Sequence, residues 1–543
     1  MRRRLPPPWA LTALLSLAYV LWTPATGDFA AQAYRVGLAD RGVWLWDDGW
    51  FGGHHLPSYS VLFPALGALV GTAAAGGVAA TVSTWAFTGL VRRLRPGRGA
   101  EAGAWWLAVG SAAMLTTGRL TFQLGLAFGL VALLLAVPRP GRGANPARTA
   151  AGLAAAVATP LASPVAALFL SFAGAVWCLD RRSARGLPAA ITVLPFLVAV
   201  ALTLAFPNGG SQPFAPWEAL LAVGSLVAVV AVLPRDERAL RIGAALYAVG
   251  VALAAVLTTP MGSNAPRLGT LLAGPILIAA VGRRRPGGRP AAIVAVAALL
   301  LVWQLYSPAQ QTLRAAGDPT TGESYYAPLR AHLLPLLRSQ PSRVEVPPSA
   351  RRGEARWLAP DVPLARGWIR QLDGERNALF YADGPLDPRV YRAWLDDNAV
   401  GWVALSDAPA DVRSKAERDL LRSGRVPGLR RVWADAHWTL WQVVGGRALA
   451  SWVARTGTPT PSGKAPHVAE MSSDRVVVET PGRGAVDLRI RWSPYLRIIR
   501  GSGCLARGPG GWTVVRSAGR GTVTVGVRLG APWRTAAPAD CRA

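Results

Sequence analysis

Long apolar runs recur between residues 9 and 305, and each is close to the ~20 residues that a helix needs to cross a bilayer. By that criterion the pattern predicts about eleven membrane spans, at 8–24, 61–91, 102–117, 120–137, 149–160, 162–179, 187–206, 217–233, 240–258, 268–282 and 290–306. Prolines in Thr159-Pro160 and Ser163-Pro164 favour two half-length helices over 149–179. We therefore expect a polytopic α-helical membrane domain over residues 1–306.

Beyond about residue 306, charged residues, prolines and mixed patterns replace the apolar runs. Strand-like segments at 400–405 and 438–444, with helix-like segments at 391–398 and 411–423, predict an α/β domain over 320–447. A Thr/Pro/Ser/Gly linker at 456–466 follows. Short Val-rich segments separated by Gly-rich turns then predict a β-sandwich domain over 465–543, with strands at 475–480, 485–492, 511–516 and 521–529.

Charge supports the membrane assignment. Charged residues make up 16% of the chain, below the ~25% of an average soluble protein. The net charge is +28, almost all of it arginine, since the only lysines are Lys415 and Lys464. Much of this arginine lies in short loops between apolar runs, where it sets orientation. No nucleic-acid-binding motif accompanies it, so no nucleic-acid partner is expected.

Arginine-rich and arginine-poor loops alternate along the chain. By the positive-inside rule the rich loops are cytoplasmic. With an odd number of spans, the N-terminus is then cytoplasmic and the C-terminal domains are extracytoplasmic, in a multi-pass plasma-membrane protein. Met1-Arg-Arg-Arg4 also resembles the start of a signal peptide; further spans favour an uncleaved first helix.

The polar residues of interest fall on the external face, in the first loop (25–60) and in two later loops. The candidates are Asp28, Arg35, Asp47, Asp48, His54, His55, Tyr59, Arg119, Asn264 and Arg267. Ionisable residues are scarce deep inside the spans, which argues against an ion-coupled transporter. Phosphate-loop, Gly-x-Ser-x-Gly, His-Glu-x-x-His and Cys-x-x-Cys motifs are absent from the sequence.

The sequence leaves open whether the protein binds a divalent cation. Asp28, Asp47, Asp48 and His54 are candidate ligands. Their spacing matches no specific metal motif, and a loop with three carboxylates is also typical of a solvated loop.

Three cysteines are present. Cys504 and Cys541 lie in the predicted external β-sandwich, where an oxidising compartment favours a disulfide over two free thiols. Cys178 lies near the cytoplasmic end of a span.

The position of Asp28 just after the first span, the long aromatic first loop and the overall layout resemble the GT-C class of integral membrane glycosyltransferases. These enzymes take a sugar from a polyprenyl-phosphate donor. Arg366-Gly-Trp-Ile-Arg-Gln-Leu-Asp373, Asn377-Ala-Leu-Phe-Tyr381 and Trp492-Ser-Pro-Tyr495 look like uncharacterised actinobacterial members of the same broad group. The chain departs from the class in its second external loop, because Thr116-Thr-Gly-Arg-Leu-Thr121 contains no carboxylate.

The resemblance implies an inverting hexosyl- or pentosyltransferase that acts on a cell-envelope glycan acceptor at the external face. Arg119, Arg267 and Arg35 would then bind the donor phosphate, and Asp28 would be the base. The lipid tail would lie between spans.

Two other interpretations of these residues stay open: Arg119 and Arg267 only reach lipid headgroups, and Asp28 only caps the following helix. Two other functions stay open as well: a transporter or flippase of a lipid-linked envelope precursor, and a non-catalytic envelope-assembly protein with the same fold.

Overall fold

The computed structural model describes residues 6–24, 26–139, 145–179, 186–282, 290–453 and 464–530. The chain forms two compact units. The first comprises Met1–Val36 and Pro57–Gly317, and the second comprises Gly37–Leu56 and Asp318–Ala543. The short segment Gly37–Leu56 therefore folds with residues that lie about three hundred positions further along the chain.

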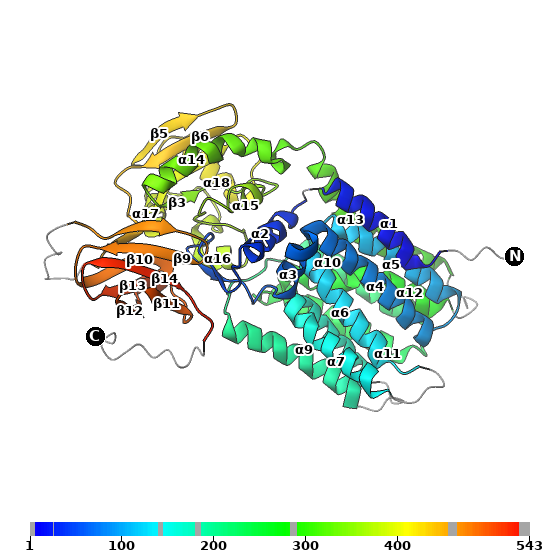
Figure 1. The fold of residues 1–543 in the computed structure, drawn as a ribbon. Helices are drawn as coiled ribbons and strands as arrows, with labels where there is room; N and C mark the ends of the chain where they lie inside the picture. Colours follow the sequence, from blue (N-terminus) through cyan, green and yellow to red (C-terminus); the bar gives the residue numbers. More distant parts are fainter. Residues whose placement is uncertain are drawn as a thin grey trace. The chain divides into compact units, whose positions relative to one another are not determined.

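The first unit is helical (Figure 1). Its helices are α1 (Pro8–Trp22), α2 (Phe29–Asp40, whose last turn enters the second unit), α3 (Leu62–Val70), α4 (Thr72–Leu94), α5 (Arg98–Leu115), α6 (Leu120–Ala136), α7 (Pro146–Ala162), α8 (Pro164–Cys178), α9 (Gly186–Ala205), α10 (Pro216–Val232), α11 (Arg238–Val256), α12 (Arg267–Val281) and α13 (Pro290–Ala315). Helices occupy all the predicted span positions. In the part of the chain that the structure describes, five are long and apolar enough to cross a membrane: Thr72–Leu94, Gly186–Ala205, Arg238–Val256, Gly262–Val281 and Pro290–Ala315. The span count and the orientation stay predictions.

Two predicted spans show breaks. The span expected at 61–91 is divided between α3 and α4 at Gly71, whose φ of 91° is a left-handed conformation that favours glycine. The 149–179 region forms two helices, as expected, with Ser163 between them. The Ser163 hydroxyl accepts a hydrogen bond from the Ala166 N–H and caps α8.

Small residues and buried hydroxyls bring the helices of the first unit close together. A Cβ at Gly103 would lie 2.4 Å from the Pro275 carbonyl oxygen, so only glycine allows α5 and α12 to approach this closely. The Thr12 hydroxyl donates to that of Thr84, linking α1 to α4. The Gln123 amide on α6 donates to Ser111 on α5 at 2.8 Å. Such contacts replace the hydrophobic driving force that is missing between helices in lipid.

An α/β domain opens the C-terminal part of the second unit. Its sheet has the order β3-β4-β6-β5 (Arg343–Glu345, Val400–Ser406, Trp438–Val443, Leu429–Ala434), and only the β3–β4 pair is parallel. Its helices are α14 (Ala327–Ser339), α15 (Glu354–Trp357), α16 (Leu372–Arg376), α17 (Pro388–Asp397) and α18 (Lys415–Arg422). The predicted strands at 400–405 and 438–444 are confirmed by β4 and β6, and the two predicted helices by α17 and α18.

A β-sandwich of two four-stranded sheets follows (Figure 1). One sheet has the order β12-β13-β10-β7 (Gly503–Arg507, Trp512–Ser517, Gly484–Arg491, Ala450–Trp452), and the other β11-β14-β9-β8 (Leu496–Arg500, Gly521–Val527, Arg475–Thr480, His467–Met471). Alternating residues of both sheets, such as Val486 and Val478, form one apolar core. Cys504 lies on β12, but Cys541 lies outside the described residues, so the disulfide stays a prediction.

Main-chain hydrogen bonds hold the segment Gly37–Leu56 within the second unit. It contains a two-stranded ribbon, β1 (Trp46–Asp47) and β2 (His54–His55). The Gly49 carbonyl accepts from the Leu364 N–H at 2.8 Å, and the Gly52 carbonyl accepts from the Arg491 N–H at 2.6 Å. The ribbon thus bonds to both the α/β domain and the β-sandwich.

Candidate functional site

Loops of the first unit bring together one carboxylate and two guanidinium groups. Asp28 immediately precedes α2, Arg119 immediately precedes α6, and Arg267 is the first residue of α12. The Arg119 Nε lies 3.7 Å from the Asp28 Oδ2. Asp28 and Arg119 both act electrostatically on Arg267, as does Tyr59. Residues more than two hundred positions apart therefore form one charged cluster.

Gly118 sets the contact between Asp28 and Arg119. Its φ is 70°, a left-handed conformation. A Cβ at this position would lie 2.2 Å from the Phe29 nitrogen and 2.7 Å from the Asp28 carbonyl carbon. The turn before α6 therefore packs directly on the backbone at the start of α2, and only glycine fits there.

The side chains of this cluster contact one another and the Phe122 ring, but they make no hydrogen bonds to the rest of the described chain. In the described part of the chain, no hydrogen bond engages the Asp28 carboxylate, and the Nε atoms of Arg119 and Arg267 are buried without a hydrogen-bond partner. Asp28 and Arg119 are about one-third exposed, at 33% and 30%. Two cations beside one carboxylate leave an excess positive charge, which is complementary to an oxyanion such as phosphate.

The helix α2 carries further polar residues on the same face as Asp28. Positions 28, 32 and 35 follow the i, i+4, i+7 spacing of one helix face. The Gln32 amide donates to the Tyr59 hydroxyl at 2.8 Å, and the Arg35 guanidinium lies 3.8 Å above the Tyr59 ring. Gln32 was missed as a candidate from the sequence, although this spacing was available to find it.

Asn264 supports the turn before α12. Its side-chain amide donates to the Pro260 carbonyl at 3.1 Å, and the residue is buried. This hydrogen bond lies within the turn itself and engages neither Asp28 nor Arg119. The role of Asn264 in the structure is therefore to shape the turn that leads to Arg267.

The other four candidates belong to the second unit and are buried there. Asp47, Asp48, His54 and His55 are exposed by only 0%, 2%, 4% and 6%. The Trp46 indole donates to Asp48 at 2.6 Å, and Asp47 accepts from the Gly49 N–H. Burial raises the pKa of Asp48 well above its usual value. These contacts place all four inside the packing of the β1–β2 ribbon, which differs from the solvated loop that the sequence left open as the alternative to a metal site.

The histidines take part in that packing. His54 stacks on Trp50 with a ring-centroid distance of 5.7 Å, and its Nδ1 lies 3.6 Å from the Asp47 carboxylate. A ring nitrogen of His55, Nε2, lies 3.0 Å from the Ser493 hydroxyl. The ribbon is therefore fixed to the β-sandwich by a side chain that the sequence suggested for substrate binding.

The residues suggested as metal ligands do not fit a resident metal ion. Asp28 lies in the first unit, whereas Asp47, Asp48 and His54 lie in the second. Within the described ranges, no three His, Cys, Asp or Glu side chains gather closely enough to hold a metal. No step of the chemistry below is therefore assigned to a metal.

No family model and no curated protein matches this sequence. Among solved structures, the chain is similar to the arabinofuranosyltransferase AftD from Mycobacteria, with 18% identity and a TM-score of 0.43 over 82% of this chain. It spans about two fifths (42%) of that protein. It is also similar to ArnT from Cupriavidus metallidurans in the apo state (13% identity, TM-score 0.39) and bound to undecaprenyl phosphate (14%, 0.39), covering 80% of this chain and 98% of ArnT in both cases. Each TM-score lies below 0.5, so the function proposed below rests on the chain's own residues.

Proposed function

We propose that this chain is a membrane glycosyltransferase of the GT-C class. It moves a sugar from a polyprenyl-phosphate donor to a cell-envelope acceptor at the external face. The observation that carries the proposal is the cluster of Asp28, Arg119 and Arg267, whose side chains make no hydrogen bonds to the residues that the structure describes. It lies at the ends of apolar helices, which is where the phosphate of a lipid-linked sugar would be presented.

The residues divide the reaction between binding and proton transfer. Arg119 and Arg267 bind the donor phosphate through guanidinium hydrogen bonds, which also stabilise the charge that develops on the leaving group. The Asp28 carboxylate takes the proton of the acceptor hydroxyl as its oxygen attacks C1 of the sugar. The bond between C1 and the phosphate oxygen breaks, polyprenyl phosphate leaves, and this single displacement inverts the anomeric centre. Tyr59, held by Gln32 and Arg35, borders the same cluster.

The test is sugar transfer by the purified full chain in lipid nanodiscs, supplied with polyprenyl-phosphate pentoses and hexoses. Asp28→Asn keeps the size of the side chain and removes the base, so we expect kcat to fall about 10²–10⁴-fold, as for loss of a general base. Asp40→Asn changes an exposed carboxylate at the other end of α2 and should leave kcat unchanged. Equal rates for wild type and Asp28→Asn would refute the assignment.

The non-catalytic alternative keeps one observation in its favour. The loop that supplies Arg119, 116–121, contains no carboxylate, and the usual second acidic group of the GT-C class is therefore missing there. Binding of a donor without turnover of any sugar, unchanged by Asp28→Asn but weakened by Arg119→Gln, would favour this alternative.

A further inference from the structure

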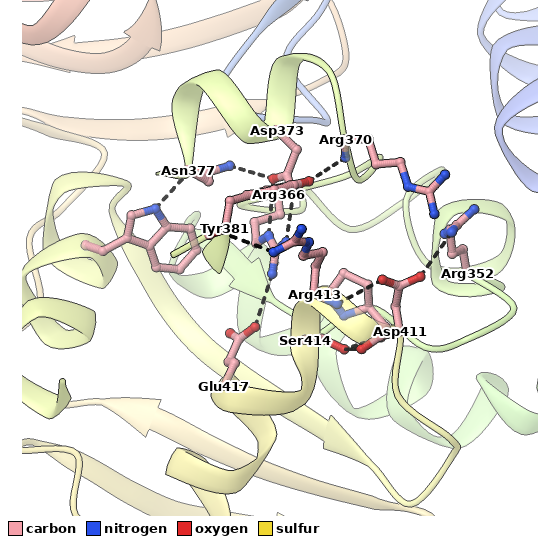
Figure 2. A network of polar contacts seen from close by, with 12 residues as sticks. Arg352, Arg366, Arg370, Asp373, Asn377, Tyr381, Asp411, Arg413, Ser414 and Glu417 are labelled. Atoms are coloured by element: carbon pink, nitrogen blue, oxygen red, sulfur yellow. Dashed lines mark hydrogen bonds and ion pairs between the residues drawn. The ribbon is translucent and has the colours of Figure 1, made fainter. Parts of the chain in front are cut away.

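A second group of arginines lies in the α/β domain, on the segment Arg366–Asp373 and beside it. Two buried side chains anchor this segment at its ends. Arg366 is 1% exposed and Asp373 is 0% exposed, and the two form a two-pronged ion pair with N–O distances of 3.2 and 2.8 Å. The remaining Arg366 nitrogen donates to Glu417 at 3.2 Å (Figure 2). The Arg366 guanidinium also lies 3.9 Å from the Phe380 ring centroid.

The backbone between these anchors is held in conformations that side chains rarely adopt. Arg370 and Gln371 have consecutive positive φ values of 72° and 44°. The Tyr381 hydroxyl accepts from the Arg370 N–H and donates to Asp373 at 2.8 Å, which ties the strained turn to the buried pair. Strain of this kind persists only where surrounding contacts over-determine it, and it concentrates at functional sites.

The strained turn presents Arg370 beside two other arginines. Arg370 is exposed, and its guanidinium has no partner among the described residues. Trp368, two residues before Arg370, lies beside the Arg352 guanidinium, and Figure 2 shows both arginines. Arg352 bonds to Asp411 at 3.0 Å, and the Arg413 guanidinium bonds to the Tyr381 carbonyl at 3.3 Å.

Aromatic rings and one carboxylate position these cations without neutralising them. The Arg352 guanidinium lies 5.1 Å from the Trp368 ring centroid, and that of Arg413 lies 5.2 Å from the Tyr381 ring centroid. Arg352 is itself in a left-handed conformation, with φ of 56°, and its Nε is buried without a hydrogen-bond partner. Among the described residues, Arg352 is the only one of the three whose guanidinium bonds to a carboxylate, that of Asp411, while the Arg413 guanidinium bonds to the Tyr381 carbonyl.

We propose that Arg352, Arg370 and Arg413 form an oxyanion-binding site that recognises a phosphate or carboxylate group on an envelope glycan or its precursor. Guanidinium groups bind both oxyanions through paired N–H donors. The strained turn fixes the backbone that carries Arg370, and the contacts of Arg352 and Arg413 hold their guanidinium groups in place before the ligand arrives, which lowers the entropy lost on binding. This site lies wholly within the second unit. Its binding of an oxyanion does not depend on Asp28, whereas the choice of an envelope glycan as the carrier of that group rests on the proposed function.

Titration of the full chain in nanodiscs of neutral lipid, by calorimetry at low salt, tests the proposal. Inorganic phosphate and glucuronate are the two probes, because they separate the phosphate from the carboxylate class. We expect saturable binding of at least one probe. Arg370→Gln and Arg413→Gln should each weaken it by about tenfold or more, as for a lost charged hydrogen bond. Arg425→Gln, a change of an exposed arginine elsewhere in the same domain, should leave it unchanged.

Two controls distinguish this site from the donor site of the first unit and from a loss of folding. Binding that Arg370→Gln removes should persist in Arg119→Gln, because Arg119 belongs to the first unit. The thermal unfolding midpoint of Arg370→Gln should match wild type, because the guanidinium is exposed. Absence of saturation by both probes, or equal weakening by Arg370→Gln and Arg425→Gln, would overturn the proposal.

Discussion

Replacing Gly118 by alanine should separate Asp28 from Arg119 without removing either side chain. The added Cβ would lie 2.2 Å from the Phe29 nitrogen, and ordinary contacts of this kind begin near 3.4 Å. The neighbouring atoms are backbone, so the turn before α6 and the start of α2 must move apart by about 1 Å. Alanine must also hold a φ of 70°, which costs about 1–2 kcal/mol.

The expected loss of stability combines these two terms. Overpacking a tight contact typically costs about 1–3 kcal/mol, so Gly118→Ala should lose about 2–5 kcal/mol. Gly317→Ala is the matched control, because Gly317 belongs to the same unit and has a φ of 72°, but nothing lies within 4 Å of its added Cβ. The control variant should lose only the free energy of unfolding that corresponds to holding alanine at a positive φ. A displacement of about 1 Å can reduce turnover about 100-fold, so Gly118→Ala should also lose most sugar transfer.

The assay is thermal unfolding of both variants in nanodiscs, followed by transfer kinetics at a temperature where each remains folded. Gly118→Ala should unfold below Gly317→Ala and should lower kcat, while Gly317→Ala keeps kcat near that of wild type. Equal unfolding midpoints for the two variants would show that the start of α2 moves away from the added Cβ at no cost in stability. The predicted effect of the close contact at Gly118 would then be wrong.

Two further predictions concern the second unit. Burial raises the pKa of Glu354 from its usual 4.5 to about 7. The folded state therefore binds more protons, and up to about 3 kcal/mol of stability is lost as pH rises from 4.5 through 7. Glu354→Gln should flatten this decline in urea unfolding at pH 5 and pH 8, and an unchanged difference between the two pH values would contradict the assignment. Asp373→Asn leaves Arg366 with one fewer carboxylate and should cost about 3–5 kcal/mol in the same assay, whereas the exposed Asp383→Asn should cost almost nothing.

Much of the helical unit could be predicted from the sequence, because apolar length is a local property. The break at Ser163-Pro164 was visible for the same reason, since proline and a capping hydroxyl mark it. The break at Gly71 was not, because the residues on both sides are apolar and only the left-handed backbone separates α3 from α4.

The candidate site, too, could be predicted from the sequence only in part. Asp28, Arg119 and Arg267 were chosen because their loops were expected on one face, and the structure brings these three together. His54 and His55 were chosen because they lie in the same first loop as Asp28, which was expected on the external face. Their burial depends on Ser493 and other residues of a domain far along the chain, and no local pattern contains that information.

The role of Gly118 could not be predicted from the sequence either. A glycine in a short loop suggests only a turn, whereas its importance here comes from a backbone contact with Phe29. The strained pair Arg370 and Gln371 shows the same limit, since neither residue type favours positive φ and the buried contacts that impose it are long-range.

The segment Gly37–Leu56 packs against residues that are synthesised much later, so the order of synthesis affects how this protein folds. This segment is made early, yet the strands and loops that receive it are completed only after the helical unit has been translated. Until then Trp50, which is fully buried in the finished fold, stays open to aggregation or chaperone binding. The chain passes from one unit to the other three times, near residues 36, 56 and 317. After a proteolytic cut near residue 317, residues 318–543 would be held only by non-covalent contacts with Gly37–Leu56, and a fragment beginning at residue 318 would lack part of its own core.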